Sequence, residues 1–386
     1  MSEWRALYVD DEAEILSTVE EWFNNIEKPI PGIESLKFDT ETDFEKAYER
    51  MTVSNYDVVI LDLRMIIKDV EDDEAGTKLL DMIRNHCFLP VIFYTGLPHL
   101  VSHLESAAVR IVEKTESFEG LEAELQYIWS TGLPSTNRAL FSHLREILKD
   151  YMWDFAMENW DEFAAIPDKT SVAHVLAKRI GASLNGSGVL NLINKMGLKK
   201  GNTATKVHPV QYYIMPPIEP ILLAGDIFFG SINGITGHWV LLSPTCDLAK
   251  DNTDMALLAF GKPLQDHDLF DKWCNGTDKG KLNSLLLNRN GDREYFLPAS
   301  LKLPDLVVDL QSLIEIPIEH LSTLERIASL DSQFAAEVQL RFVRYYGRRG
   351  VPDLDASIIL ERLEEYKKAK PADIIPALTT ATACQG

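Results

Sequence analysis

The first 130 residues alternate short apolar runs with segments of helical spacing, and this alternation restricts the possible folds more than any other feature of the chain. Five strand-then-helix units in this length predict an α/β fold with a five-stranded, doubly wound parallel sheet of the flavodoxin-like kind. Functional sites in such sheets lie outside the carboxyl ends of the strands. The expected strands are 6–12, 35–41, 56–65, 90–96 and 110–114, and the expected helices include 13–26, 43–51, 76–86 and 118–130.

The remainder of the chain changes character twice. A break rich in Gly, Pro, Ser and Thr at 131–138 is the expected domain boundary, and a helical connector follows at 138–200. Short strands separated by Gly and Pro then predict a mainly β, barrel-like α+β domain at 205–370 with C-terminal helices, among them 318–346. The tail at 371–386 is expected to be frayed.

Charge and cysteine content argue against several classes of protein. The formal net charge is −21, and residues 1–130 carry −17 of it. We therefore expect the protein not to bind membranes, and to bind nucleic acid, if at all, only through a local basic site on its second half. The four cysteines have no zinc spacing and are too few for a disulfide framework. No secretory signal or membrane span is visible, so we expect a cytoplasmic protein.

Polar side chains end four of the five expected strands. Asp10 and Asp11 end the first strand, Asp62 the third, Thr95 the fourth and Lys114 the fifth. The carboxyl ends of parallel strands meet at one edge, so these side chains should converge. Three neighbouring carboxylates repel one another unless a cation joins them, and oxygen ligands favour Mg²⁺. With a lysine to bind an anion, the cluster predicts a site for one phosphoryl group beside a metal ion.

The elements YVDDE, VVILDLRM, YTG and VEK occur in this order, and with them residues 1–130 resemble the receiver domain of bacterial two-component response regulators. The resemblance implies that Asp62 accepts a phosphoryl group from the phosphohistidine of a sensor histidine kinase or phosphotransfer protein. The implied Mg²⁺ ligands are Asp10, Asp11, Asp62 and the backbone carbonyl of Arg64, and the implied phosphoryl-binding and switch residues are Thr95 and Lys114.

Two departures from the family pattern concern the read-out. An acidic insertion, IIKDVEDDEA, displaces Gly76, and it is either a solvated loop or a segment that slows phosphoryl donors or binds a second cation. Ile111 occupies the position at which the family often has a Tyr or Phe that changes rotamer on activation. We therefore do not expect the signal to be transmitted by rotation of an aromatic side chain. A receiver fold that never takes phosphate is the alternative interpretation.

The second half offers two weaker motifs. In GHWVLLSPTCDLA (237–249), His238, Cys246 and Asp247 lie close in sequence, which fits either a thiol nucleophile or a buried structural cysteine with Asp247 as a turn cap. The GDIFF segment (225–229) and the following HWVLLS resemble the SH3-like barrel of PemK/MazF-type toxins, a family whose members cut RNA.

Arginines and aromatic residues alternate in RFVRYYGRRG (341–350). Arg341, Arg344 and Arg348 are spaced to share one helix face, where they could stack on bases, complement the helix dipole, or dock on the acidic first domain.

The sequence as a whole predicts a response regulator with an atypical output domain that lacks a helix-turn-helix. A receiver-controlled effector enzyme of nuclease or toxin type, for example in phage defence, is the alternative; no complete catalytic set is visible. The apolar stripe of the connector predicts either a homodimer or packing within one chain. It comprises Leu140, Leu144, Leu148 and Tyr151.

Overall fold

The computed structural model divides the chain into two compact units, 1–204 and 205–386. We describe each unit by itself. The expected frayed tail at 371–386 and parts of the connector lie outside the residues that the structure describes. The described residues are 3–25, 30, 35–53, 55–67, 70–72, 75–114, 118–184, 192–196, 206–218, 220–250, 252–348 and 354–368.

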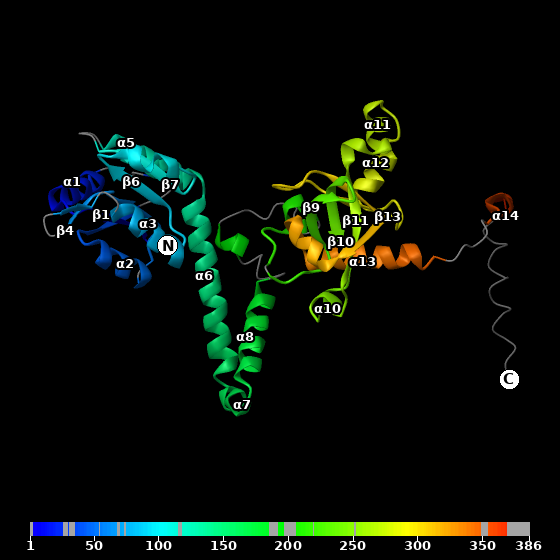
Figure 1. Ribbon diagram of the computed structural model, residues 1–386, viewed down its shortest axis with the longest axis horizontal. Coiled ribbons are helices and arrows are strands. Elements are labelled where there is room, and N and C mark those ends of the chain that lie inside the picture. The colour runs from blue at the N-terminus through cyan, green and yellow to red at the C-terminus, as the bar shows by residue number, and fades with distance from the viewer. Residues whose placement is uncertain are drawn as a thin grey trace. The chain divides into compact units, whose positions relative to one another are not determined.

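A five-stranded parallel sheet forms the centre of the first unit (Figure 1). The order of its strands is β2-β1-β3-β6-β7. Its strands are β1 (Trp4–Val9), β2 (Leu36–Glu41), β3 (Val58–Leu61), β6 (Val91–Thr95) and β7 (Val109–Glu113). Every residue of β3 and β6 is buried, which explains why these central strands are almost continuous apolar runs. The strand order is that of flavodoxin-like sheets, so the predicted fold class is confirmed.

Helices cover both faces of this sheet, and each face has its own hydrophobic core. One core contains Leu16 and Val19 of α1 together with Leu121 and Leu125 of α5. The other contains Ala47 of α2 and side chains of α3. The helices are α1 (Ala13–Asn24), α2 (Phe44–Val53), α3 (Ala75–His86), α4 (Pro98–Val101), the 3-10 turn η1 (Ser102–Leu104) and α5 (Glu119–Ser130).

The acidic insertion forms a small antiparallel hairpin of β4 (Met65–Ile67) and β5 (Val70–Asp72). Residues 68–69 and 73–74 lie outside the described residues. The hairpin leaves the sheet directly after β3 and returns the chain to α3, so the insertion lengthens the loop without changing the order of the strands.

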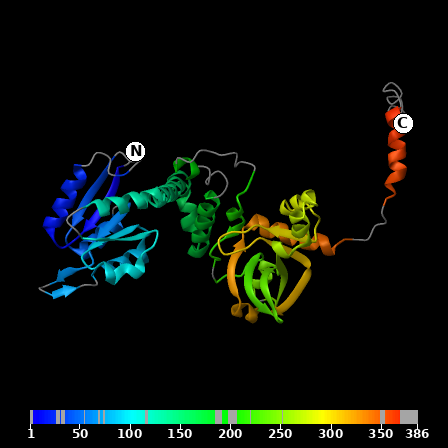
Figure 2. The same cartoon turned by 90° about the horizontal axis from the view of Figure 1, so that it is seen from above.

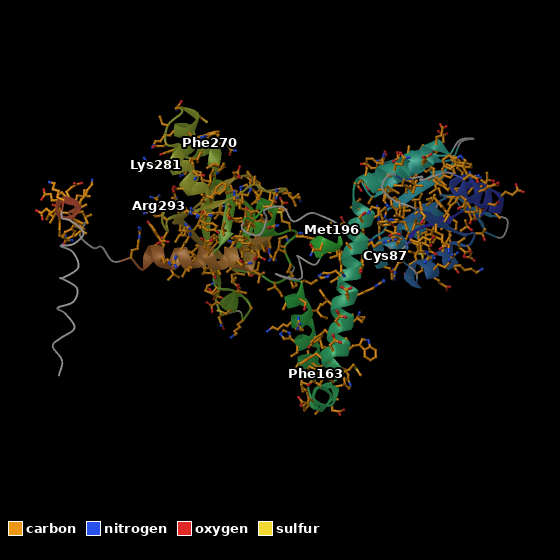
Figure 3. The ribbon with its side chains drawn as sticks, turned by 180° about the vertical axis from the view of Figure 1, so that it is seen from behind. Cys87, Phe163, Met196, Phe270, Lys281 and Arg293 are labelled. Atoms are coloured by element: carbon orange, nitrogen blue, oxygen red, sulfur yellow. The ribbon has the colours of Figure 1, made fainter. Side chains whose placement is uncertain are left out.

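The connector is a helical hairpin in which α6 and α8 contact each other, and Phe163 lies at its turn (Figure 3). Because α6 begins at Leu133, most of the expected break at 131–138 is helical. Leu140 and Leu148 of the predicted stripe are 39% and 47% exposed, so the homodimer stays a prediction. The elements are α6 (Leu133–Tyr151), the π-helical turn η2 (Met152–Ala156), α7 (Trp160–Ala165) and α8 (Lys169–Ser183).

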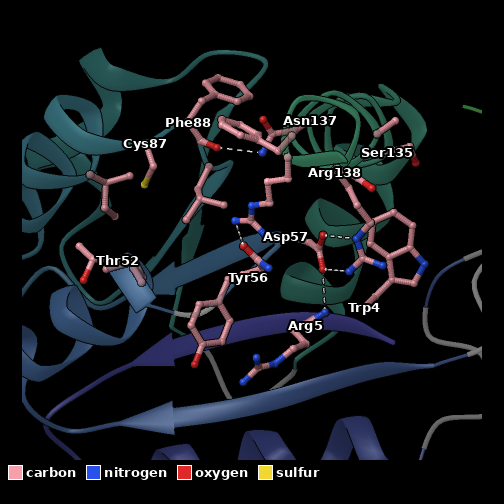
Figure 4. A pocket seen from close by; sticks show the side chains of 18 of the residues that line it. Trp4, Arg5, Thr52, Tyr56, Asp57, Cys87, Phe88, Ser135, Asn137 and Arg138 are labelled. Atoms are coloured by element: carbon pink, nitrogen blue, oxygen red, sulfur yellow. Dashed lines mark hydrogen bonds and ion pairs between the residues drawn. The ribbon is translucent and has the colours of Figure 1, made fainter. Parts of the chain in front are cut away.

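Arg138 of α6 is bound to the amino edge of the sheet (Figure 4). Its Nε donates to Asp57 Oδ1 at 2.9 Å, its Nη2 donates to Asp57 Oδ2 and to the carbonyl oxygen of Glu3, and the guanidinium lies 3.7 Å from the centre of the Trp4 ring. The Arg5 backbone N–H donates to the same carboxylate at 2.8 Å. Asp57 is buried, so this bidentate pair fixes the start of α6 on the sheet.

The second unit is a seven-stranded antiparallel sheet in the order β12-β13-β11-β10-β9-β14-β8, and Figure 2 shows its strands curving around a common centre. This architecture confirms the prediction of a mainly β second half. The strands are β8 (Tyr213–Ile214), β9 (Asp226–Ile232), β10 (Ile235–Leu241), β11 (Met255–Pro263), β12 (Glu294–Leu297), β13 (Leu306–Pro317) and β14 (Glu325–Leu330).

One prediction for this unit was wrong: residues 318–346 are not all helical. They comprise a 3-10 turn, the strand β14 and only then a helix; β14 pairs with β9 inside the sheet. A short segment such as this can satisfy a helical or a strand pattern, and the pairing partner decides. The helices and turns are η3 (Pro209–Tyr212), α10 (Thr245–Leu248), η4 (Leu264–Asp266), α11 (Asp268–Cys274), α12 (Lys279–Leu286), η5 (Ile318–Thr323), α13 (Ser332–Tyr346) and α14 (Ala356–Lys368).

Candidate functional site

Three carboxylates converge at the carboxyl edge of the first sheet. Asp10 and Asp11 follow β1, Asp62 follows β3, and one carboxylate oxygen of each lies within 4.8 Å of the others. Parallel pairing brings them together, because the Asp62 N–H donates to the carbonyl of Val9 at 2.9 Å. Asp10 and Asp62 are buried, while Asp11 is half-buried, so the cluster is open to solvent on the Asp11 side.

Lys114, which follows β7, joins two of these carboxylates. Its Nζ lies 2.8 Å from Asp62 Oδ2 and 2.8 Å from Asp10 Oδ2. The backbone N–H of Lys114 donates to the carbonyl of Thr95 at 2.9 Å, which fixes the lysine to the end of β6. The site therefore brings together a cluster of three carboxylates and a primary ammonium group.

Burial and charge act in opposite directions on these groups. Burial raises the pKa of Asp62, and the hydrogen bond from Lys114 reverses this only in part. Burial lowers the pKa of Lys114, but its hydrogen bonds to Asp10 and Asp62 more than compensate, so the pKa of Lys114 lies above its usual value. The lysine is thus held as a cation beside two carboxylates.

Thr95 ends β6 with its side chain buried, and its Oγ1 accepts the N–H of Leu97 at 3.2 Å. The hydroxyl therefore lies at the start of the loop after β6, on the same edge of the sheet as Lys114.

Gly76, which the insertion displaces in sequence, packs directly against the acidic site. Its N–H donates to the carbonyl of Leu63 at 3.0 Å. A β-carbon at position 76 would overlap the carbonyl oxygen of Asp62 and lie 2.9 Å from Cα of Leu63. The backbone of α3 can therefore approach Asp62 this closely only with glycine at this position.

The donor set fits a hard divalent cation. Three carboxylates that present one oxygen each to a common point need a positive charge between them, and Mg²⁺ takes oxygen ligands of this kind. Lys114 supplies part of that charge to Asp10 and Asp62. The backbone carbonyl of Arg64 remains a proposed fourth ligand, two residues beyond Asp62 in the chain.

The predicted residues of the second unit do not form one site. His238 lies in β10 opposite Phe229, with ring centroids 4.9 Å apart, and burial lowers its pKa. Cys246 lies in α10 with its Sγ 3.7 Å from Asp247 Oδ1, and within the described ranges no hydrogen bond joins His238 to either residue. Cys246 is exposed, so the interpretation as a buried structural cysteine was wrong.

The predicted arginine face of α13 is also divided. Arg341 is only 8% exposed, and its guanidinium donates to the carbonyls of Gly291 and Asn288 and to Glu337 Oε1. It thus holds the loop before β12 in place and does not share an exposed stripe with Arg344. Arg344 and Arg348 are exposed, so these two alone remain candidates for an external partner.

Tyr8 and Asp57 belong to the site and to its support, yet the sequence analysis did not single them out. The Tyr8 hydroxyl donates to Asp10 Oδ2 at 2.7 Å. A usable signal existed for Tyr8, because residues two apart on a strand point to the same face. None existed for the pairing of Asp57 with Arg138, which are 81 residues apart.

No family model and no curated protein matches the chain. Among solved structures, the response regulator TrrA from Thermotoga maritima in complex with Mg²⁺-BeF is 28% identical over 32% of this chain and 98% of its own, with a TM-score of 0.27. The receiver domain of the Francisella response regulator 1452 is 21% identical over 34% of this chain and 99% of its own, also with a TM-score of 0.27.

A mycobacterial endoribonuclease in complex with its cognate antitoxin also matches, at 8% identity over 34% of this chain and 99% of its own, with a TM-score of 0.23. Since all three TM-scores are low, we assign the fold from the topology of the chain itself. The strand order gives residues 3–130 a flavodoxin-like fold, and the three carboxylates lie at the carboxyl edge of its sheet. None of the described helices has the length and hydropathy needed to cross a membrane.

Proposed function

We propose that this protein is a response regulator whose Asp62 accepts a phosphoryl group from the phosphohistidine of a sensor kinase or phosphotransfer protein. The observation that carries the proposal is the Lys114 ammonium, 2.8 Å from Asp62 and from Asp10, in a cluster with Asp11 at the carboxyl edge of the sheet. A site for a dianionic phosphoryl group needs a bound cation and a basic side chain; the three carboxylates and Lys114 at this edge support both requirements.

In the proposed reaction, a carboxylate oxygen of Asp62 attacks the phosphorus of the donor. A P–O bond forms, the P–N bond of the phosphohistidine breaks, and the imidazole leaves. Mg²⁺, bound by Asp10, Asp11, Asp62 and the carbonyl of Arg64, would neutralise charge on the transferred group. Lys114 turns from the carboxylates to a phosphoryl oxygen, and the Thr95 hydroxyl donates to another, which draws the loop after β6 toward the site.

The second unit is the proposed output domain. Its own hydrophobic core and its identity as a compact unit support a module whose activity phosphorylation controls. A receiver-controlled effector enzyme remains the second proposal, supported by the exposed thiol of Cys246 beside Asp247. Loss of a cellular effect on Cys246→Ser substitution, with the fold intact, would favour the enzyme over a binding module.

The phosphoacceptor proposal is tested with acetyl phosphate and Mg²⁺. We expect a phosphorylated species by intact mass for the wild type and none for Asp62→Asn. The matched control is Asp43→Asn, because Asp43 caps α2 by accepting the N–H groups of Glu45 and Lys46 and lies outside the acidic cluster. Equal modification of the wild type and Asp62→Asn would remove Asp62 from its role.

A further inference from the structure

The carboxylate of Asp10 accepts three hydrogen bonds. Its Oδ2 accepts the Tyr8 hydroxyl at 2.7 Å and the Lys114 ammonium at 2.8 Å, and its Oδ1 accepts the backbone N–H of Glu12 at 3.0 Å. A carboxylate oxygen has two lone pairs, so these contacts saturate Oδ2 and leave one lone pair on Oδ1. The donors thus determine which oxygen of Asp10 can still bind a cation.

We propose that Tyr8 is a positioning residue for the cation site, whose hydroxyl holds the Asp10 carboxylate in the orientation that binds the divalent ion. This inference rests on the proposed function, because it assigns to Tyr8 a part in the binding step that precedes phosphoryl transfer. Tyr8 itself contacts neither the ion nor the phosphoryl group. It acts through Asp10.

The Tyr8 ring is fixed in place by its surroundings. The side chain is fully buried in the core between the sheet and the helices α1 and α5. It packs edge-on against Tyr94 of β6, with ring centroids 6.3 Å apart. Because the Tyr8 hydroxyl is already held in place, little conformational entropy is lost in ordering it when the cation binds.

The fixed Tyr8 hydroxyl is important because Lys114, the other side-chain donor to Asp10, moves away in the proposed reaction. Lys114 is shared between Asp10 and Asp62, and its proposed role requires it to turn to a phosphoryl oxygen. Once it does so, the Tyr8 hydroxyl is the side-chain donor that still holds Oδ2 of Asp10. Hydrogen-bond partners of metal ligands orient those ligands, and their removal weakens metal binding by about tenfold or more.

The test is a titration of the full chain with Mg²⁺ alone, followed by the amide resonances of residues 9–12 and 61–63. We expect Tyr8→Phe to bind Mg²⁺ about tenfold more weakly than the wild type. The matched control is Tyr295→Phe in the second unit, a tyrosine that is also buried and whose hydroxyl donates to Glu337 Oε2 at 3.0 Å. This control should bind Mg²⁺ with the affinity of the wild type.

The outcomes separate the two proposals. A wild type that shows no response to Mg²⁺ contradicts the proposed function itself. A wild type that binds Mg²⁺, with Tyr8→Phe binding equally well, overturns the role of Tyr8 and leaves the proposed function standing. A purely structural role for Tyr8 predicts lower stability of Tyr8→Phe with an unchanged Mg²⁺ affinity of the folded protein.

A measurement on the wild type covers the case in which Tyr8→Phe does not fold. The Tyr8 hydroxyl proton, buried and hydrogen-bonded to Asp10, should give a resonance protected from exchange both before and after Mg²⁺ is added. If this resonance disappears on saturation with Mg²⁺ while the fold is kept, the hydroxyl does not hold Asp10 in the bound state and the inference is wrong.

Discussion

Lys114 balances two buried carboxylates that would otherwise repel each other. Asp10 is fully buried and Asp62 is 5% exposed, so neither can exchange this partner fully for water. When one partner of a buried ion pair is removed, the charge that remains is left uncompensated, and this is the costly event. The residue that prepares the site for an anion therefore also stabilises the fold while the anion is absent.

Substitution of Lys114 by Met should lower the free energy of unfolding by about 3 kcal/mol near neutral pH in the absence of Mg²⁺. The deficit should shrink as the pH falls, because Asp62, whose pKa burial already raises, takes up a proton and no longer needs the ammonium. At high pH the titration of Lys114 itself sets the limit. Because its pKa is raised in the folded protein, its contribution is undiminished by its own titration below about pH 10.4 and is lost as the pH rises through the folded-state pKa.

Urea unfolding at about pH 5 and about pH 7, followed by tryptophan fluorescence, measures this effect. Lys46→Met is the matched control, since Lys46 forms an exposed ion pair with Asp43 at 3.6 Å and should change stability by less than about 1 kcal/mol. A Lys114→Met protein as stable as the wild type at both pH values would contradict this account.

Among the elements, α6 shows how the connector is joined to the parallel sheet of the first unit. The helix does not begin as a free linker, because Arg138 binds Asp57 through two nitrogens and stacks on Trp4. Asn137 adds a hydrogen bond from its Nδ2 to the carbonyl of Phe88 at 3.0 Å. The amino edge of the sheet thus holds α6 at the end opposite to the acidic cluster.

Arg138→Met should destabilise the first unit by about 3 kcal/mol and speed amide exchange in the first turns of α6, because it leaves Asp57 buried without its cation. Burial raises the pKa of Asp57 even with Arg138 present. Hydrogen–deuterium exchange with mass spectrometry measures the local effect. Arg145→Met is the control, since Arg145 is exposed and donates to Asn55 Oδ1; equal exchange in the two variants would argue against the anchoring role of Arg138.

For the molecule as a whole, the two units have separate hydrophobic cores. We therefore expect two unfolding transitions in calorimetry, because each unit should unfold cooperatively together with its own hydrophobic core. Lys114→Met should lower the temperature of one transition. Arg341→Met should lower the other, because it leaves the carbonyls of Asn288 and Gly291 without their buried donor.

Arg344→Met is the control for the second transition. Arg344 lies on the same helix as Arg341 but is exposed, so its loss should leave both transitions in place. A single transition that both Lys114→Met and Arg341→Met shift would show that the units do not unfold separately.

The sequence alone determined the features that depend on local pattern and on chain order. Alternating apolar and helical segments predicted the parallel sheet, and the strand ends predicted that Asp10, Asp62 and Lys114 would meet, because parallel strands place their carboxyl ends at one edge. The tyrosine two residues before Asp10 was within reach of the same reasoning.

Tertiary structure alone decided which polar groups are buried and what they bind. Arg341 looked like part of an exposed cationic face, but its position over the loop before β12 buries it. Residues 325–330 form a strand because β9 pairs with them. Asp57 and Arg138 meet only because the folded chain returns to the sheet. Burial and pairing depend on contacts between distant segments, and no local pattern of residues specifies those contacts.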